Sequence, residues 1–410
     1  MVGISAILTS LSAAATSWWD GGSPFAAYTA LWPTDGEGKY IIEAEGIRMA
    51  FTAHNGGAPT NLWINDTNGN EVDILLGLDK AEEYVNYTGI LGGTLVENKP
   101  TYEKKLILKI LPGRVTGPIS GASFQINNKT YHTLPNSPDG KSTVDGGDMG
   151  WSRRPLDLVS HTQNSILFVK FDRAGKHGLP GTAASSIAHA VYPNEWRIAY
   201  GVTPSRTSDP IPINLSLMTF WNLDGFVSGS SGTVREHVLH MPFSGFRLEE
   251  DEHGIPTGDI KSNVKDSRHD FWSQPKAISE ALDKKQEQDH DYDILHLINR
   301  REPFDKDTSP VATLSSPLSG IFMDLYTDRA AVRLRTWNNS TAPNLTLKQC
   351  QGGIERKVKK SAALSLQMQD WPDALNHPEW QRQNHVLFGP ERLMTTFTKF
   401  KFSVKKIDGL

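Results

Sequence analysis

From about residue 39 onward the chain is a succession of short segments that mix β-branched or aromatic residues with polar ones at near-alternating positions. Gly, Pro, Asn or Asp bounds each segment, which is the pattern of strands separated by turns. We expect strands over residues 39–45, 47–53, 106–110, 165–171, 195–202, 213–220 and 331–336. Such a series favours a sandwich or barrel over alternating strand–helix units. The sequence therefore predicts an all-β protein with a large antiparallel β-sandwich and few short helices.

One segment departs from this pattern. Residues 276–288 are rich in charged, helix-forming residues and follow Pro275, so we expect a helix there. Residues 102–109 are basic and read as a surface insertion. No Pro/Ser-rich linker divides the chain, and no repeat of solenoid or propeller length is present. We therefore expect residues 21–410 to form a single domain.

The N-terminus and the Asn-x-Ser/Thr sequons bear on where the protein is found. Residues 1–17 are apolar or small, which is similar to a signal-peptide core, although no Lys or Arg begins the segment. The sequons lie at Asn65, Asn86, Asn128, Asn214, Asn338, Asn339 and Asn344. We expect residues 1–20 to be a signal peptide or an N-terminal extension, and the protein to be secreted; a cytoplasmic location is the alternative.

The net charge and the lack of long apolar stretches bear on which kinds of partner the protein binds. The formal net charge of −4 carries no basic excess, so neither nucleic acid nor an anionic membrane is indicated as a partner. Beyond the N-terminus no apolar stretch of about eighteen residues predicts a membrane span. We expect a small-molecule ligand, and the sequence leaves the oligomeric state open.

Familiar catalytic and metal-binding signatures are missing. The chain has no Gly-x-Gly-x-x-Gly, Walker, His-Glu-x-x-His or Gly-x-Ser-x-Gly motif. Cys350 is the only cysteine, so no disulfide or Cys-rich zinc site can form, and its surroundings read as an ordinary loop. His237 and His240 lie in a strand-like context where residues three apart face opposite sides. We expect packed or hydrogen-bonded histidines, no metal and no cofactor.

A set of unusual strings occurs in a fixed order along the chain. They include Gly-Leu-Pro-Gly, Pro-Ile-Asn-Leu, Phe-Trp-Asn-Leu-Asp-Gly, Pro-Thr-Gly, Tyr-Asp and a Gln-Asp-Trp-Pro-Asp-Ala segment followed by Asn-His-Pro, at residues 178–181, 212–215, 220–225, 256–258, 292–293, 369–374 and 376–378. Together they resemble the aldose 1-epimerase family, also called galactose mutarotases, from about residue 42 to residue 401. The resemblance implies a sugar-binding cleft on one sheet and cofactor-free interconversion of anomers. That reaction needs a base at the anomeric hydroxyl and an acid at the ring oxygen.

The two groups that the resemblance implies for this proton transfer are replaced. Gln367 stands where the family has its glutamate base, and a carboxamide does not accept a proton at ordinary pH. Met218 stands where the family has its histidine acid. Because each acid–base group typically contributes ~10²–10⁴ in rate, we expect little ordinary galactose mutarotation.

Of the sugar-binding positions that the resemblance implies, Asp293 is retained. Asp145 replaces a histidine, and Gly117-Pro118 replaces an Asn-Arg pair. We predict Asp293, Asp145 and Gln367 as the catalytic-site residues, with Asp293 and Asp145 as the acid–base pair. We predict the substrate-binding residues to be Trp151, Met218, Trp221, Asn222 and Arg153.

Two interpretations remain open from the sequence. In the first, Met218, Trp151 and Trp221 make the cleft more apolar than a sugar site, and the protein is a cofactor-free isomerase, cyclase or dehydratase for an apolar substrate. In the second, the protein binds carbohydrate without catalysis, or is a mutarotase with unusual catalytic residues. Simple loss of the old site is the alternative explanation for each replaced residue.

Overall fold

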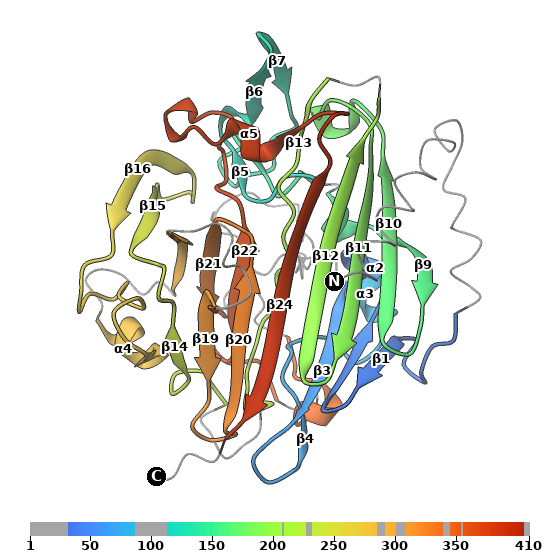
Figure 1. Ribbon diagram of the computed structural model, residues 1–410, viewed down its shortest axis with the longest axis vertical. Helices are drawn as coiled ribbons and strands as arrows, with labels where there is room; N and C mark the ends of the chain where they lie inside the picture. Colours follow the sequence, from blue (N-terminus) through green and yellow to red (C-terminus); the bar gives the residue numbers. More distant parts are fainter. Residues whose placement is uncertain are drawn as a thin grey trace.

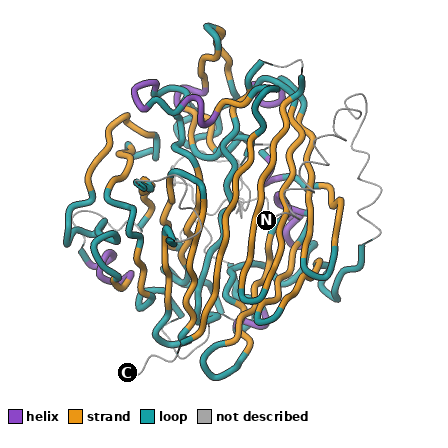
Figure 2. The backbone as a smooth tube through the Cα atoms, in the orientation of Figure 1, coloured by secondary structure: helices purple, strands orange, loops and turns teal. Residues whose placement is uncertain are grey.

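The computed structural model describes residues 32–86, 113–148, 150–206, 209–226, 232–284, 292–300, 309–338, 345–353 and 356–405. The segment 102–109, the strand expected over residues 106–110, and the N-terminal residues 1–20 lie outside this part of the chain. Figures 1 and 2 show that the described chain is built mainly of long strands in stacked layers.

One layer is a nine-stranded antiparallel sheet that runs across the molecule (Figure 1). In spatial order it contains β17 (Lys276–Ala277), β14 (Val238–His240), β19 (Ala312–Ser315), β20 (Ile321–Thr327), β24 (Met394–Val404), β12 (Glu195–Pro204), β11 (Ala183–Tyr192), β10 (Ser165–Asp172) and β9 (Asp157–His161). In β12 every second residue is buried, because one face of the strand packs on the core while the other is more open to solvent.

The second layer consists of two smaller antiparallel sheets. One contains β1 (Tyr40–Ala44), β2 (Ile47–Phe51), β3 (Pro59–Asn65) and β4 (Glu71–Asp73) in that order; the other runs β16 (Pro256–Ser262), β15 (Phe246–Glu250), β18 (Asp293–Leu297), β21 (Ala331–Thr336) and β22 (Leu364–Gln369). Trp221 joins them, since its backbone forms bridges with Leu75 on one side and Leu364 on the other. The predicted large antiparallel β-sandwich is confirmed.

Short hairpins and single helical turns complete the fold. The two-stranded pairs are β5 (Pro118–Ile119) with β8 (Thr143–Val144), β6 (Ser123–Ile126) with β7 (Lys129–His132), and β13 (Ile211–Pro212) with β23 (Leu387–Phe388). The α-helical turns are α2 (His54–Gly57), α3 (Glu83–Asn86), α4 (Ile278–Asp283) and α5 (Gln383–Val386). The 3₁₀ turns are η2 (Ser120–Ala122), η3 (Trp151–Arg153), η4 (Lys176–Gly178), η5 (Gln349–Gln351) and η6 (Pro378–Trp380). Among the described residues, no helix is long and apolar enough to cross a membrane.

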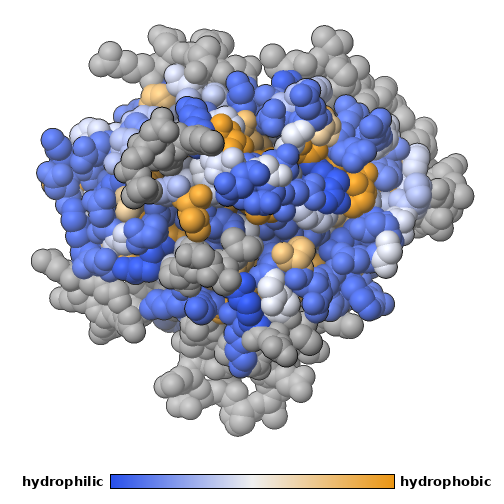
Figure 3. All heavy atoms as spheres, turned by 90° about the horizontal axis from the view of Figure 1, so that it is seen from below, coloured by the Kyte–Doolittle hydropathy of each residue, from blue (hydrophilic) through white to orange (hydrophobic). Residues whose placement is uncertain are grey.

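The core between the layers is aromatic. Trp196 of β12 stacks on Phe400 of β24 with ring centroids 5.0 Å apart, and Trp221 lies 5.0 Å from Phe400. Both tryptophans are fully buried. On the face shown in Figure 3, hydrophobic residues form only separate patches among hydrophilic ones.

Most of the expected strands that fall on described residues are present. Strands at residues 40–44, 47–51, 165–172, 195–204 and 331–336 match the predictions to within a few residues. The strand expected over residues 213–220 is wrong as a regular element. Its backbone bonds to several separate segments, for example Ile213 N–H to Val386 O and Leu76 N–H to Phe220 O, so no continuous ladder forms.

The helix expected over residues 276–288 is confirmed only in its first half. Residues Lys276–Ala277 pair with β14 as strand β17, and α4 covers Ile278–Asp283. The Ala277 N–H bonds to the Glu280 carboxylate at 3.2 Å, which caps the start of the helix. Residues 285–291 lie outside the described chain.

Candidate active site

The five-stranded sheet carries the candidate site on one of its faces. Across β18, β21 and β22 the register places Asp293 opposite Arg335, and Arg333 opposite both Leu295 and Gln367. Residues directly opposite each other on antiparallel strands share a face of the sheet. Asp293, Arg333, Arg335 and Gln367 therefore lie on one surface, which we call the sheet floor.

Two arginines and two carboxylates on this floor form one network. The Arg333 Nε donates to Asp293 Oδ1 at 2.5 Å, and its Nη1 and Nη2 donate to the two Glu250 carboxylate oxygens at 2.8 and 3.0 Å. The Arg335 Nε donates to Asp293 Oδ2 at 2.8 Å. We call Glu250, Asp293, Arg333 and Arg335 the arginine–carboxylate cluster; its two positive charges balance its two negative charges when both carboxyls are ionised.

The cluster is partly shielded, and Asp293 is its most open member. The Asp293 side chain is 36% exposed, whereas those of Glu250 and Arg333 are 12% and 13% exposed. A molecule approaching the floor from solvent therefore has its easiest access at Asp293.

The two carboxyl groups have pKa values pushed in opposite directions. Burial raises the pKa of Glu250, and the attraction of Arg333 offsets this only in part. Burial would also raise the pKa of Asp293, but Arg333 and Arg335 outweigh it and hold that pKa below its usual value. Asp293 is thus the more acidic carboxyl, and Glu250 the one that keeps a proton to higher pH.

Gln367 and Met218 lie beside this cluster. The Gln367 Nε2 donates to the Ser216 hydroxyl at 2.6 Å, and Arg335 Nη1 lies 3.7 Å from the Met218 sulfur. Ser216 and Met218 are two residues apart, and these two contacts bring both side chains to the sheet floor. The structure therefore places Asp293, Gln367 and Met218 in one region, and their roles in a site stay predictions.

A hydrophobic border lies next to the cluster on the same floor. Leu248, Leu295, Leu297 and Ala331 form a buried group that packs against the partly buried Trp371 and Trp380. The two indoles meet edge to face with centroids 5.4 Å apart. The Trp380 Nε1 donates to Gly258 O at 2.9 Å, which fixes its ring against the Pro-Thr-Gly strand β16.

Asp145, predicted as the acid–base partner of Asp293, forms a hydrogen bond with the backbone of Gly117. Its Oδ1 accepts the Gly117 N–H at 2.7 Å, in the turn after β8. A Cβ on Gly117 would lie 2.6 Å from Pro372, so this turn is packed against the loop that follows β22. The carboxyl that shares the Arg333 guanidinium with Asp293 is Glu250, and the acid–base role of Asp145 stays a prediction.

The three tryptophan and asparagine residues predicted to bind substrate are core residues. Trp221 has no exposed surface and packs on Phe400, and Trp151 is 1% exposed and lies against Gly113. The Asn222 Nδ2 donates to Ala362 O at 2.8 Å. A fully buried ring offers no face to a ligand, so this part of the prediction is wrong. The backbone of Arg153 lies in η3, and its side chain is outside the described part of the structure.

The sequence did not predict five residues of the sheet floor and its border: Glu250, Arg333, Arg335, Trp371 and Trp380. The signal for the arginines was present, since Arg333 and Arg335 alternate with Val332 and Leu334 in a strand that was expected. The sequence did not show the order of the strands in the sheet. β22 lies beside β21 and brings Gln367 to the floor, while β15 lies beside β18 on the other side and brings Glu250.

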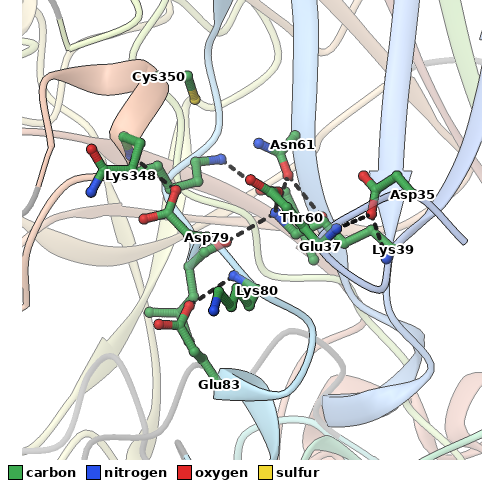
Figure 4. Close-up of polar contacts among 12 residues, drawn as sticks. Asp35, Glu37, Lys39, Thr60, Asn61, Asp79, Lys80, Glu83, Lys348 and Cys350 are labelled. Atoms are coloured by element: carbon green, nitrogen blue, oxygen red, sulfur yellow. Dashed lines mark hydrogen bonds and ion pairs between the residues drawn. The ribbon is translucent and has the colours of Figure 1, made fainter.

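Cys350, an exposed residue, lies beside a separate buried polar group. Asp73 accepts bonds from Asn61 at 2.7 Å and from Lys348 at 2.5 Å, and the Cys350 Sγ lies 3.5 Å from the same carboxylate. Figure 4 shows Lys348 reaching Thr60, and Lys39 reaching Asn61. Burial and the nearby Asp73 raise the pKa of Cys350 to about 12, so the thiol stays protonated and unreactive.

His237 and His240 have the structural roles expected of them. His237 is fully buried, and its Nε2 accepts the Leu223 N–H at 3.0 Å. His240 lies in β14 near Trp272 O, so the two histidines do not share a partner in these contacts. Among the described residues, no group of three His, Cys, Asp or Glu side chains is arranged to hold a metal ion.

Comparisons with known proteins agree with this architecture. A family model described as "Aldose 1-epimerase" matches residues 39–394. The chain is 45% identical to "Epimerase FSL3" of Gibberella zeae, over 99% of this chain and 94% of that one. It is 25% identical to "Galactose mutarotase" of Bos taurus over 89% of this chain and 94% of that one. Among solved structures, the GalM/aldose epimerase homologue from C. elegans superposes with a TM-score of 0.71 at 24% identity, covering 90% of this chain and 99% of that one. The chain belongs to the aldose 1-epimerase family.

Proposed function

We propose that the protein is a cofactor-free epimerase that opens and recloses a cyclic hemiacetal more apolar than an ordinary aldose. The reaction type follows the family and its relative named an epimerase. Ring opening is therefore favoured over the cyclase or dehydratase chemistry that the sequence also left open.

The observation that carries the proposal is the pairing of Gln367 with Ser216 at the position of the family's base. The carboxamide donates a hydrogen bond of 2.6 Å there, and it has no lone pair basic enough to take a proton at neutral pH. With Met218 beside Arg335, neither of the two usual groups remains. Rapid mutarotation of glucose or galactose through those groups is not expected.

The preference for an apolar substrate rests on the border of the sheet floor. Trp371 and Trp380 are both only partly buried, and they stand against the leucines that adjoin Glu250 and Arg333. Aromatic side chains at the edge of a cleft favour ligands with apolar surface. Trp151 and Trp221 are buried in the core and take no part in this preference.

Exchange NMR between the two anomers tests the proposal directly. The panel contains glucose, galactose and a δ-lactol that carries a hexyl chain, each with and without the protein. We expect faster anomer exchange for the hexyl lactol and almost none for the two sugars. Rapid exchange of galactose, or no acceleration of any hemiacetal, would overturn it.

A second function, carbohydrate binding without catalysis, is favoured by one feature. Asp293 is held by two arginines, and an ionised carboxylate can bind sugar hydroxyls without needing to transfer a proton. Line broadening of galactose signals with no anomer exchange for any hemiacetal would support this function instead.

A further inference from the structure

We propose that Glu250 is the second proton-transfer group of the cleft, acting with Asp293 across the guanidinium of Arg333. The inference rests on the proposed hemiacetal chemistry and adds to it the residue that replaces the family's missing acid.

The first support is the geometry of Arg333. All of its donors that the structure pairs here point to the two carboxyls, with Nε on Asp293 and both terminal nitrogens on Glu250. A planar guanidinium with carboxyls along two of its edges fixes the positions of both. Glu250 and Asp293 are therefore oriented by one rigid group, on neighbouring strands β15 and β18 of the same sheet.

The second support is where the cluster stands in the cleft. Arg333 is directly opposite Gln367 on β22, so the guanidinium that holds both carboxyls lies one strand away from the position of the family's base. Glu250 is also the last residue of β15, two residues beyond Leu248 of the hydrophobic border. A substrate whose apolar part rests on Trp371 and Trp380 has its polar end near Glu250.

The third support is the difference in acidity between the two groups. The Glu250 pKa is raised because the carboxyl is buried, and the Asp293 pKa is lowered because two arginines outweigh its burial. An acid–base reaction needs one protonated and one ionised group at the same pH, and two carboxyls with separated pKa values supply them.

The reaction then balances without a cofactor. The Asp293 carboxylate takes the proton of the anomeric hydroxyl, and the carbonyl forms as the bond from the anomeric carbon to the ring oxygen breaks. The ring oxygen receives that electron pair and the proton of the Glu250 carboxyl. After rotation of the aldehyde the ring closes on its other face, and each proton returns to its donor.

The test is a pair of substitutions at Glu250 with a matched control on the same strand. Glu250→Gln keeps the size of the side chain and one of its two acceptors for Arg333, but its carboxamide has no acidic proton to transfer. Glu250→Asp keeps the carboxyl and moves it back by one methylene. Glu249→Gln is the control, because Glu249 is the adjacent residue of β15 and its side chain is 41% exposed in an ion pair with Arg247.

The readout is the anomer exchange rate of the hexyl lactol across pH, for the full-length protein and each variant. In the wild type the rate falls at low pH as Asp293 gains a proton, and at high pH as Glu250 loses one. Glu250→Gln should lower the rate by roughly 10²–10⁴ and remove the fall at high pH. Glu250→Asp should keep that fall, and Glu249→Gln should match the wild type.

The outcomes separate the two proposals. If the wild type accelerates exchange and Glu250→Gln does so equally, with the same fall at high pH, Glu250 has no catalytic role while the proposed function stands. If the wild type accelerates no hemiacetal, both proposals are wrong. A thermal melt of each variant shows whether it is folded. The inference is supported if Glu250→Gln is folded but slow and Glu250→Asp keeps the fall in rate at high pH.

Discussion

A buried histidine, His189, should make the free energy of unfolding fall as the pH is lowered. His189 of β11 is 1% exposed, and its ring lies between Phe51, Phe168 and Trp196 with centroids 4.7, 6.3 and 5.8 Å away. Neither ring nitrogen has a hydrogen-bond partner within the described residues. Burial lowers the pKa of His189 to about 3, from an ordinary value of 6.5.

The sign and size of the effect follow from this shift. The unfolded chain takes up a proton on this histidine below pH 6.5, while the folded protein does not until about pH 3. Stability is therefore fully present above pH 6.5 and is lost as the pH falls toward 3. At about 1.4 kcal/mol per pH unit, His189 alone removes roughly 2 kcal/mol of unfolding free energy between pH 7 and pH 5.

The assay is urea unfolding at pH 7 and pH 5, followed by tryptophan fluorescence. His189→Leu removes the titrating group but keeps an apolar side chain of similar volume, so its loss of stability over this range should be smaller by roughly 2 kcal/mol. At pH 7 the variant should be at least as stable as the wild type, because an unpaired buried polar ring is removed. His132→Gln, at an exposed position in β7, is the control. Equal losses in the wild type and His189→Leu would refute the reasoning.

Three further outcomes follow from the described contacts. Arg333→Met leaves Glu250 and Asp293 without their shared cation and should cost roughly 3–5 kcal/mol of unfolding free energy in urea at pH 7, with a smaller loss at low pH, where the carboxyls are protonated. Trp380→Ala should lower kcat/KM for the hexyl lactol about tenfold with little effect on galactose binding; equal changes for both ligands would exclude an apolar subsite. Cys350 should react with iodoacetamide at pH 8 at least tenfold more slowly than free cysteine, and labelling as fast as free cysteine would contradict the raised pKa of this thiol.

The sequence predicted the layers well because strand alternation reports burial on one face. Residues 331–336 show this, since Val332 and Leu334 alternate with two arginines and the strand has the expected bounds. It failed for Trp221, because the segment around it lies between two sheets and is buried on both faces. Alternation carries no information there, and a tryptophan that fills the core looks the same in sequence as one that lines a cleft.

The site was predictable only where the resemblance supplied a position. Asp293, Gln367 and Met218 were found through their flanking strings, and the structure brings them near one another. Glu250 was not found, because its meeting with Arg333 joins residues 83 positions apart and depends on the order of strands in the sheet.

The sequon at Asn214 shows how packing decides between readings that a motif leaves open. Its side chain is 1% exposed, and its amide donates to Asp370 O at 3.1 Å, so a glycan at this position has no room in the folded protein. Asn65 and Asn128, by contrast, are exposed at the end of β3 and in the turn between β6 and β7. Secretion stays a prediction that depends on such exposed sequons and on the N-terminal segment.

The balance of charge on the sheet floor gives a physical reason for Gln367. Two arginines already face two carboxylates there, and Gln367 lies directly opposite Arg333. A glutamate at this position would put a third carboxylate beside the same guanidinium, and like charges in a partly shielded site raise each other's pKa values. The carboxamide avoids this and instead anchors Ser216. In this arrangement a neutral Gln367 leaves the guanidinium of Arg333 to the two carboxyls of Glu250 and Asp293.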